Sequence, residues 1–165
     1  MKKLIFVRHG KAEDPASGIS DYERSLTLKG KIISRLMARK LRDTEKSSLT
    51  IITSPAFRAI ETALIFAMEF GVEPDKIIIN SALYYKMNLR YLPEILAHIG
   101  DNNDTVMMFG HNPSFTEIAN SLSSEGCDLM SKSGVVGISF DISKWQEIRQ
   151  KSGKQEYFLK PEKDL

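Results

Sequence analysis

The chain has 165 residues, of which 42% are hydrophobic and 27% charged. This composition excludes a disordered or collagen-like chain, and the length predicts one domain over residues 1–165. The 23 lysines and arginines are scattered among 21 aspartates and glutamates, which argues against nucleic acid as a partner.

The start of the chain and its lone cysteine predict where the protein resides. Only four apolar residues, Leu4–Val7, precede Arg8, too few for a signal peptide or a membrane span. Cys127 has no second cysteine to pair with, which favours a reducing compartment. We therefore expect a cytoplasmic monomer with no membrane partner. The role of Cys127, a packing residue or a reactive thiol, stays open.

The first strand and helix are predicted from apolar spacing. Residues 4–7 form a continuous apolar run, typical of a strand buried on both faces of a parallel sheet, and end at Arg8-His9-Gly10. Thr27 is the expected N-cap of the following helix. The apolar positions that recur at helical spacing there, and that we expect to face the core, are Leu28, Ile32, Leu36, Met37 and Leu41.

The same alternation continues along the chain. Residues 49–53 predict a second strand, and Ser54-Pro55 predict the cap and first turn of a helix that Gly71 ends. Residues 77–79 predict a third strand, followed by a helix near 89–99 between Asn88 and Gly100. Further strands are expected at 105–109, 135–142 and 157–159, with a short helix near 115–122. The pattern predicts an α/β fold, a three-layer α/β/α sandwich with a largely parallel central sheet.

Three polar clusters follow expected strands, at the edge of the sheet where ligands bind in open α/β folds. They are Arg8-His9-Gly10, residues 54–58 and Gly110-His111-Asn112. Arginine offers a planar fork that matches phosphate oxygens, and Arg58 is expected in the first turn of its helix, where backbone amides favour anions. Gly10 would let the backbone approach the ligand closely. These residues predict a phosphate site.

The order of these motifs resembles the histidine phosphatase superfamily, which has a phosphoglycerate mutase-like fold. The resemblance rests on the strand ending in Arg8-His9-Gly10, on Ser54-Pro55 leading to Arg58 and Thr62, and on Gly110-His111-Asn112. The short chain, and the further residues Asp21, Arg24, Leu26-Thr27, Gly30, Trp145, Gly153 and Leu159-Lys160-Pro161, resemble its compact phosphohistidine phosphatase branch.

The resemblance implies a phosphatase in which His9 attacks phosphorus and is transiently phosphorylated. It implies that Arg8, Arg58 and His111 hold the phosphoryl oxygens, with Gly10 and Asn112 beside them. Nearby arginines disfavour protonation of His9, which suits a nucleophile, whereas His111 would act best as a cation. The expected substrate is a phosphorylated protein bearing phosphohistidine, and no cofactor is expected.

The expected site lacks one component of related enzymes. Mutase-like members place a glutamate after the third strand, where this chain reads 83–86 as Leu-Tyr-Tyr-Lys, and acid phosphatase-like members place an aspartate where this chain has Asn112. Asp21 and Glu13 are possible proton donors, and spacing does not choose between them. A pocket without a strong acid favours phosphohistidine over an ester, because imidazole leaves more readily than an alkoxide. Tyr84 and Tyr85 are open to two roles, lining the pocket mouth or packing.

Two alternatives remain on the sequence alone. One is a phosphatase for a small-molecule phosphoester, with Asp21 or Glu13 supplying the proton, and the other is a non-catalytic phosphate-binding module. The presence of His9 with all three expected phosphate ligands argues against the module. No histidine pair has metal-ligand spacing and the only cysteine stands alone, so we expect a metal-independent enzyme.

Overall fold

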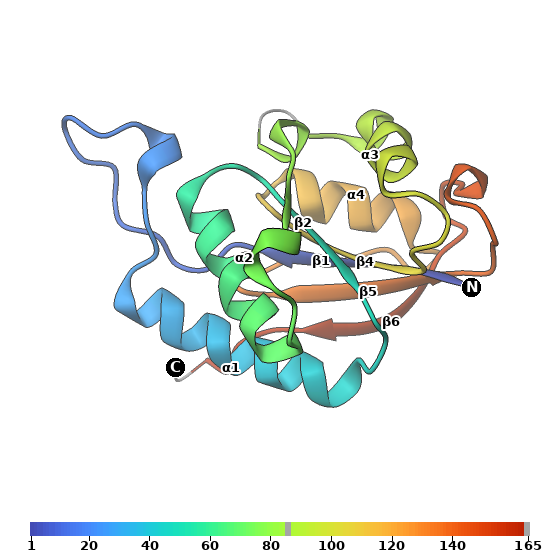
Figure 1. Ribbon diagram of the computed structural model, residues 1–165, viewed down its shortest axis with the longest axis horizontal. Helices are drawn as coiled ribbons and strands as arrows, with labels where there is room; N and C mark the ends of the chain where they lie inside the picture. The colour runs from blue at the N-terminus through green and yellow to red at the C-terminus, as the bar shows by residue number, and fades with distance from the viewer. Residues whose placement is uncertain (85–86, 164–165) are drawn as a thin grey trace.

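One six-stranded sheet runs through the protein, with helices on both of its faces (Figure 1). The computed structural model describes residues 1–84 and 87–163. Its strands are β1 (Lys2–Arg8), β2 (Thr50–Thr53), β3 (Ile78–Ile79), β4 (Thr105–Gly110), β5 (Val135–Phe140) and β6 (Lys154–Leu159). Its α-helices are α1 (Leu28–Thr44), α2 (Phe57–Phe70), α3 (Leu92–Ile99) and α4 (Ser114–Leu122). Its 3-10 helices are η1 (Asp21–Glu23), η2 (Pro74–Lys76), η3 (Ser81–Leu83), η4 (Leu89–Tyr91) and η5 (Trp145–Glu147).

The strand order is β3-β2-β4-β1-β5-β6. The four strands β3, β2, β4 and β1 pair in parallel, whereas β5 runs antiparallel to both β1 and β6. The predicted α/β class with a largely parallel sheet is therefore confirmed. The last strand begins at Lys154, three residues earlier than its apolar run predicts.

The two faces of the sheet pack into separate apolar cores. On one face, alternate residues of β1 such as Leu4 and Phe6 contact the buried sides of α3 and α4. On the other face, Ile5 and Val7 contact α1 and α2. Because successive strand residues point to opposite faces, a continuous apolar run such as β1 serves both cores. This arrangement gives the three layers, and it holds the strand ends rigidly beneath the loops.

The inward face of α1 differs from the prediction. Leu28, Ile32 and Leu36 were expected to face the core, but their exposed fractions are 75%, 54% and 40%. The side toward the sheet instead carries Met37 and smaller residues such as Gly30. A Cβ atom on Gly30 would lie 2.2 Å from the carbonyl oxygen of Lys11, so the helix approaches the chain too closely for large side chains there. The prediction is confirmed for Met37 and Leu41, which are buried, whereas small residues occupy the rest of the buried side.

Helix α2 begins later than predicted. Its N-cap is Ala56, which makes no side-chain cap hydrogen bond, so Ser54 and Pro55 lie before the helix. The end at Gly71 is as predicted, with φ of 70° in the left-handed region that glycine adopts readily. The expected helix after Asn88 is divided into η4 and α3, and the Asn88 side chain caps the first of these. Within the described ranges, no helix has the length and hydropathy to cross a bilayer.

Candidate active site

The register of the parallel strands brings the two sequence-predicted histidines together. Arg8, the last residue of β1, pairs with Gly110, the last residue of β4. His9 and His111 therefore leave the sheet side by side, and their ring centroids lie 5.1 Å apart. On the far side of β4, the N–H of Ser54 bonds to the carbonyl oxygen of Phe109 at 2.9 Å. Three strand ends thus meet at one edge, as the sequence predicts.

These strand ends border a cavity of about 570 Å³ that is open to solvent. The lining residues come from six segments of the chain and include most of the predicted site. They are Arg8, His9, Asp21, Arg24, Arg58, Tyr84, His111, Asn112, Pro113, Ser114 and Lys132. The structure therefore brings together five of the predicted residues and Asp21, but it does not place Gly10 or Glu13 on the cavity wall.

His9 is held in the tautomer that a nucleophile needs. Its Nδ1 atom lies 2.7 Å from the carbonyl oxygen of Gly10. A carbonyl oxygen only accepts, so Nδ1 carries the proton and Nε2 keeps its lone pair. Burial and, to a lesser extent, the nearby His111, Arg58 and Arg8 together lower the pKa of His9 to about 3, against the opposing hydrogen bond to Gly10. His9 is thus neutral and nucleophilic at pH 7.

His111 is fixed from both sides of its ring. Its Nε2 lies 2.8 Å from Oγ of Ser54, and its Nδ1 lies 3.5 Å from Nη2 of Arg58. Burial lowers the pKa of His111 to about 4, and the charges of Arg58 and Arg8 act in the same direction against that of Asp21. With only the protein's own groups around it, His111 is neutral at pH 7, in contrast to the cation expected from the sequence. A bound phosphoryl dianion would raise its pKa.

Two arginines reach the cavity from different elements. Arg8 ends β1 and donates from Nη1 to the carbonyl oxygen of Met130 at 2.9 Å. Its Nε is buried and has no hydrogen-bond partner among the described residues. Arg58, the second residue of α2, is 6% exposed and donates from Nη2 to Oδ2 of Asp21 at 2.9 Å. Both guanidinium groups are held by hydrogen bonds before any ligand binds, which favours a fixed anion site.

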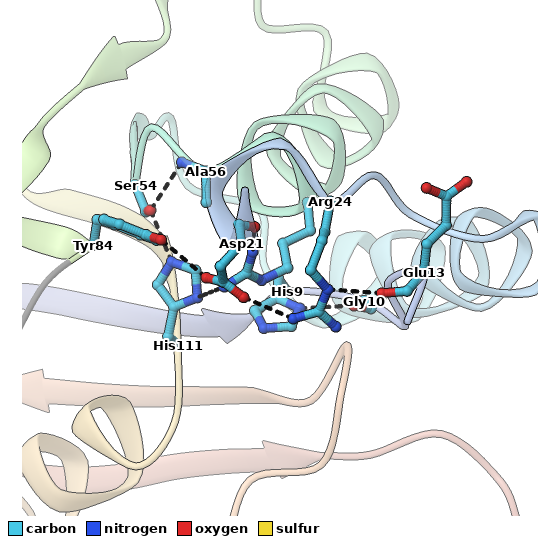
Figure 2. Close-up of polar contacts among 10 residues, drawn as sticks. His9, Gly10, Glu13, Asp21, Arg24, Ser54, Ala56, Tyr84 and His111 are labelled. Carbon is cyan, nitrogen blue, oxygen red and sulfur yellow. Dashed lines mark hydrogen bonds and ion pairs between the residues drawn. The ribbon is translucent and has the colours of Figure 1, made fainter. Parts of the chain in front are cut away.

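Asp21 is the focus of a polar cluster at the cavity wall (Figure 2). Its carboxylate accepts from Arg24 at 2.8 Å, from Arg58 at 2.9 Å and from the hydroxyl of Tyr84 at 2.9 Å. Burial alone would raise the pKa of Asp21, but these three donors hold it well below its usual range. Asp21 is therefore ionised at pH 7 and accepts hydrogen bonds rather than giving a proton.

The second possible donor, Glu13, lies apart from the cluster. Its carboxylate points away from the other labelled side chains, and only its backbone oxygen takes part, accepting from Nε of Arg24 at 2.7 Å (Figure 2). Glu13 is exposed to solvent. The geometry places Asp21 and not Glu13 within reach of a bound ligand.

Gly10 has a packing role that differs from its expected contact with phosphate. Its N–H donates to Oγ1 of Thr62 at 3.0 Å, so this amide is already used. A Cβ atom at Gly10 would lie 2.5 Å from Oγ of Ser34 and 3.1 Å from Oγ of Ser133. The absent side chain therefore makes room for α1 and for the loop before β5, and the close approach is to protein rather than to a ligand.

Asn112 lines the cavity and also fastens a neighbouring loop. Its Nδ2 donates to the carbonyl oxygen of Met130 at 2.9 Å, and its Oδ1 accepts from Thr116 at 3.0 Å. Met130 receives the hydrogen bond from Arg8 as well. Asn112 thus helps to hold the carbonyl group that orients Arg8.

Sequence reasoning missed two features of the site. Ser54 was taken for a helix cap, but its hydroxyl contacts His111, and Lys132 lines the cavity from a loop with no recognisable motif. Local sequence patterns do not predict the order of the strands in the sheet, and it is this order that places Ser54 beside His111. Tyr84 does line the cavity, with its ring centroid 5.4 Å from that of His111. Tyr85, the other tyrosine considered, lies outside the described residues.

The described residues do not favour metal-dependent or thiol-based catalysis. Among residues 1–84 and 87–163, no three His, Cys, Asp or Glu side chains form a group that could hold a metal ion. Cys127 does not line the cavity, and burial together with Asp128 raises the pKa of its thiol to about 11. A thiol with so high a pKa is a poor nucleophile, so a packing role is favoured over a reactive one.

Comparison with protein families supports the resemblance seen in the sequence. The family model of the histidine phosphatase superfamily (branch 1) matches residues 4–81. This stretch holds Arg8, His9 and Arg58, and it ends before His111. An uncharacterized protein of Picosynechococcus sp. is 39% identical over 74 residues, which cover 44% of this chain and 45% of the relative's length.

Solved structures share the whole fold. A candidate phosphohistidine phosphatase SixA from Agrobacterium tumefaciens is 23% identical, with a TM-score of 0.78 over 98% of this chain and 99% of that one. The protein histidine phosphatase SixA complexed with tungstate is 22% identical, with a TM-score of 0.77 over 96% and 97%. A mycobacterial glucosyl-3-phosphoglycerate phosphatase is 13% identical, with a TM-score of 0.70 over 95% and 98%. These likenesses confirm the predicted phosphoglycerate mutase-like fold, and the family match over residues 4–81 supports the predicted resemblance.

Proposed function

We propose that this chain, which matches the histidine phosphatase superfamily over residues 4–81 and has the fold of the SixA phosphatases, is a metal-independent phosphohistidine phosphatase. It hydrolyses a phosphoryl group from a phosphorylated protein of the cytoplasm through a covalent intermediate on His9. The observation that carries the proposal is the state of His9, which is buried and neutral beside two guanidinium groups and keeps Nε2 unprotonated.

The first step transfers the phosphoryl group to the enzyme. Nε2 of His9 forms a bond to phosphorus while the P–N bond of the substrate breaks, and the substrate imidazole takes up a proton from solvent water in the open cavity and leaves as a neutral ring. Arg8 and Arg58 supply donors to the phosphoryl oxygens as charge moves in the transition state. The Gly10 carbonyl stabilises the charge that develops on the His9 ring, because Nδ1–H already points to it.

The second step returns the enzyme to its starting state. A water oxygen bonds to phosphorus, the P–Nε2 bond breaks, and phosphate leaves. The two arginines offset its negative charge until it dissociates. His111 lies beside His9 and gains proton affinity next to the bound phosphoryl group. It can then donate a hydrogen bond to a phosphoryl oxygen in both steps.

The protonation state of Asp21 favours phosphohistidine over an ester. An alkoxide leaving group needs a proton from an acid in the cavity, and Asp21 is ionised through three hydrogen bonds. An imidazole needs much less assistance, since its basicity is close to that of solution buffers at pH 7. The absence of a protonated carboxyl group among the described cavity residues therefore supports the phosphoramidate substrate.

The decisive experiment is to trap the intermediate. The enzyme is mixed briefly with a protein carrying ³²P-labelled phosphohistidine, quenched in alkali, and mapped by mass spectrometry. We expect label on His9 that acid removes, and no label in His9→Ala. His98→Ala is the matched control, because His98 is exposed and bonds to the carbonyl oxygen of Glu94 in its own helix. Full labelling of the His9→Ala enzyme would refute the mechanism.

The same preparation separates the proposed substrate from the alternative. Turnover of phosphohistidine protein is compared with turnover of small phosphoesters at equal concentration. We expect kcat/KM for phosphohistidine to be higher by about a hundredfold or more, the size that general acid catalysis typically contributes. A preference for the esters would favour the small-molecule phosphatase.

A further inference from the structure

The outer side of α1 carries large apolar side chains where a solvated helix normally carries polar ones. Leu28, Ile32 and Leu36 recur every four residues and are exposed by 75%, 54% and 40%. With Ile65 of α2 and the stems of Arg35 and Arg39, they line a groove of about 450 Å³. We call this surface the α1–α2 groove. Its apolar lining is part of a regular stripe, so it is not explained as isolated exposed residues.

A second apolar stripe lies on α2 beside this groove. Phe57, Leu64 and Met68 share one side of the helix and are exposed by 42%, 38% and 70%. Nη2 of Arg35 lies 3.9 Å from Sδ of Met68, so the two helices form one continuous surface.

The groove has an excess of positive charge. Its described lining includes three basic residues, Lys31, Arg35 and Arg39, and no acidic one. Across from them, Glu69 alone accepts ion pairs from Arg35, Arg39 and Arg42, and Glu61 lies 3.7 Å from Lys31. Two carboxylates therefore neutralise only part of this charge. A ligand of this surface should be both apolar and acidic.

The surface reaches the mouth of the active-site cavity through a row of aromatic rings. The ring centroids of Phe57 and Tyr22 lie 5.9 Å apart, and those of Tyr22 and Tyr84 lie 5.5 Å apart. Tyr84 in turn lies 5.4 Å from His111, centroid to centroid. A protein seated on α1 and α2 would thus lie beside the cavity that receives its phosphorylated side chain.

We propose that the α1–α2 groove docks an acidic amphipathic helix of the phosphorylated partner protein. The inference rests on the proposed function, since it names the surface by which that substrate is recognised. A helix presents apolar residues at the three- and four-residue spacing that a groove between two helices accepts, with acidic residues beside Arg35 and Arg39. The groove supplies binding energy, and the cavity supplies the chemistry.

The same features disfavour other occupants. A second copy of this chain packed on α1 through a two-fold axis would bring Arg35 and Arg39 against their own equivalents, and like charges in a contact cost several kcal/mol. A lipid surface suits a helix whose apolar residues project from a convex face. Here Leu28, Ile32 and Leu36 line a concave one.

The test uses a fluorescent synthetic helix with leucines on one side and glutamates on the other, titrated with the full-length protein. We expect its dissociation constant to rise about tenfold or more in Ile32→Ser/Leu36→Ser and in Arg35→Glu/Arg39→Glu, the loss expected for interface anchors. A leucine–lysine helix of equal length should not bind. Ile79→Ser is the matched control, because Ile79 is 57% exposed on β3, away from the groove.

Each other outcome overturns the docking proposal. These outcomes are equal binding by the groove variants, binding of the lysine helix, or no binding of the acidic helix. If phosphatidylserine vesicles capture the wild-type protein and the groove variants abolish that capture, a membrane is favoured as the ligand of the groove. If the wild-type protein sediments as a dimer and the groove variants sediment as monomers, a second copy of this chain is favoured as the occupant of the groove.

Activity measurements test the docking proposal and the proposed function separately. We expect the groove variants to turn over free phosphohistidine at the wild-type rate, and to lose at least tenfold in kcat/KM on an acidic amphipathic peptide that carries phosphohistidine, chiefly through KM. If the wild-type enzyme binds the acidic helix but cleaves neither substrate, the docking proposal is supported and the proposed function is refuted.

Discussion

The carboxylate of Asp21 accepts a hydrogen bond of 2.9 Å from Nη2 of Arg58, the guanidinium group expected to hold phosphate. Nη1 of the same arginine donates to the backbone oxygen of Asp21 at 2.7 Å. An incoming phosphoryl group must therefore share Arg58 with an anion that the protein already provides. This arrangement keeps Arg58 in place, at some cost in affinity for phosphate.

Asp21→Asn should strengthen anion binding. The amide keeps a hydrogen-bond acceptor for Arg58 but removes a negative charge from the cavity wall, so repulsion of the bound anion falls. We expect tungstate to bind several-fold more tightly at pH 7, by up to about tenfold, measured by isothermal titration calorimetry. Turnover of phosphohistidine should change less than about tenfold, because an ionised Asp21 gives no proton.

Glu13→Gln is the control for that experiment. It removes a carboxylate of the same loop that points away from the cluster, and it should leave tungstate affinity unchanged (Figure 2). A loss of a hundredfold or more in kcat for Asp21→Asn would assign the proton transfer to Asp21. The phosphoester alternative would then gain support.

Ser54→Ala should impair the chemistry through His111. The Ser54 hydroxyl is fully buried, lies 2.8 Å from Nε2 of His111 and accepts from the N–H of Ala56 at 3.2 Å. Its loss frees the ring to rotate or to change tautomer. We expect kcat to fall about tenfold with KM nearly constant, and stability to fall by about 1 kcal/mol for the lost hydrogen bonds. The ¹⁵N chemical shifts of the His111 ring should report the change of tautomer.

A remote serine provides the comparison for Ser54. Ser139 is 5% exposed and bonds to Glu156 on β6, away from the cavity. Ser139→Ala should lower stability by a similar amount and leave kcat and the His111 shifts unchanged. Equal kinetic effects in both variants would mean that Ser54 acts through general stability alone.

Gly10→Ala tests whether this glycine serves packing or phosphate binding. The added methyl group would lie 2.5 Å from Oγ of Ser34, so we expect overpacking to lower the free energy of unfolding by about 1–3 kcal/mol. Adding Ser34→Ala, which removes the clashing Oγ atom and favours the helix, should restore most of that stability in urea denaturation. KM for a small phosphoramidate should be near the wild-type value in the double variant. A KM that stays tenfold high after stability is restored would instead assign a ligand contact to Gly10.

The core of the active site could be predicted because its residues follow strands directly. A strand buried on both faces is visible as an apolar run, and its carboxyl end is then known to within a residue. Residues placed there, such as His9 and His111, meet whenever their strands are neighbours. The cavity geometry accordingly agrees with the sequence for the residues that follow β1 and β4.

The remaining features depend on the path of the chain between elements. The loop from β1 to α1 brings Asp21 onto Arg58, and no local pattern distinguishes Asp21 from Glu13 before that path is known. The prediction for α1 was wrong at Leu28, Ile32 and Leu36, though right at Met37 and Leu41, for a related reason. Spacing alone gives the period of a helix, whereas the close approach of Gly30 to the backbone of Lys11 decides which side faces inward.

Acid should destabilise the protein through its two buried active-site histidines. The unfolded chain protonates each ring near pH 6.5, whereas the folded protein does so only near pH 3 for His9 and pH 4 for His111. Below pH 6.5 the unfolded state therefore binds more protons, and the free energy of unfolding decreases as the pH falls.

The useful window for this last measurement is pH 5.5 to 6.5, where Asp21, Glu45 and Glu125, whose pKa values the fold lowers, are largely ionised in both states and the histidines dominate the difference. Each contributes a slope of up to about 1.4 kcal/mol per pH unit as the unfolded ring becomes protonated. Urea denaturation should show that His9→Asn reduces this pH dependence, because one buried imidazole is gone. His98→Asn is the control and should leave the pH dependence unchanged, since His98 is exposed on α3 and lies outside the cavity. Identical slopes for wild type and His9→Asn would mean that His9 is protonated in the folded enzyme at these pH values, and such an imidazole could not act as the nucleophile.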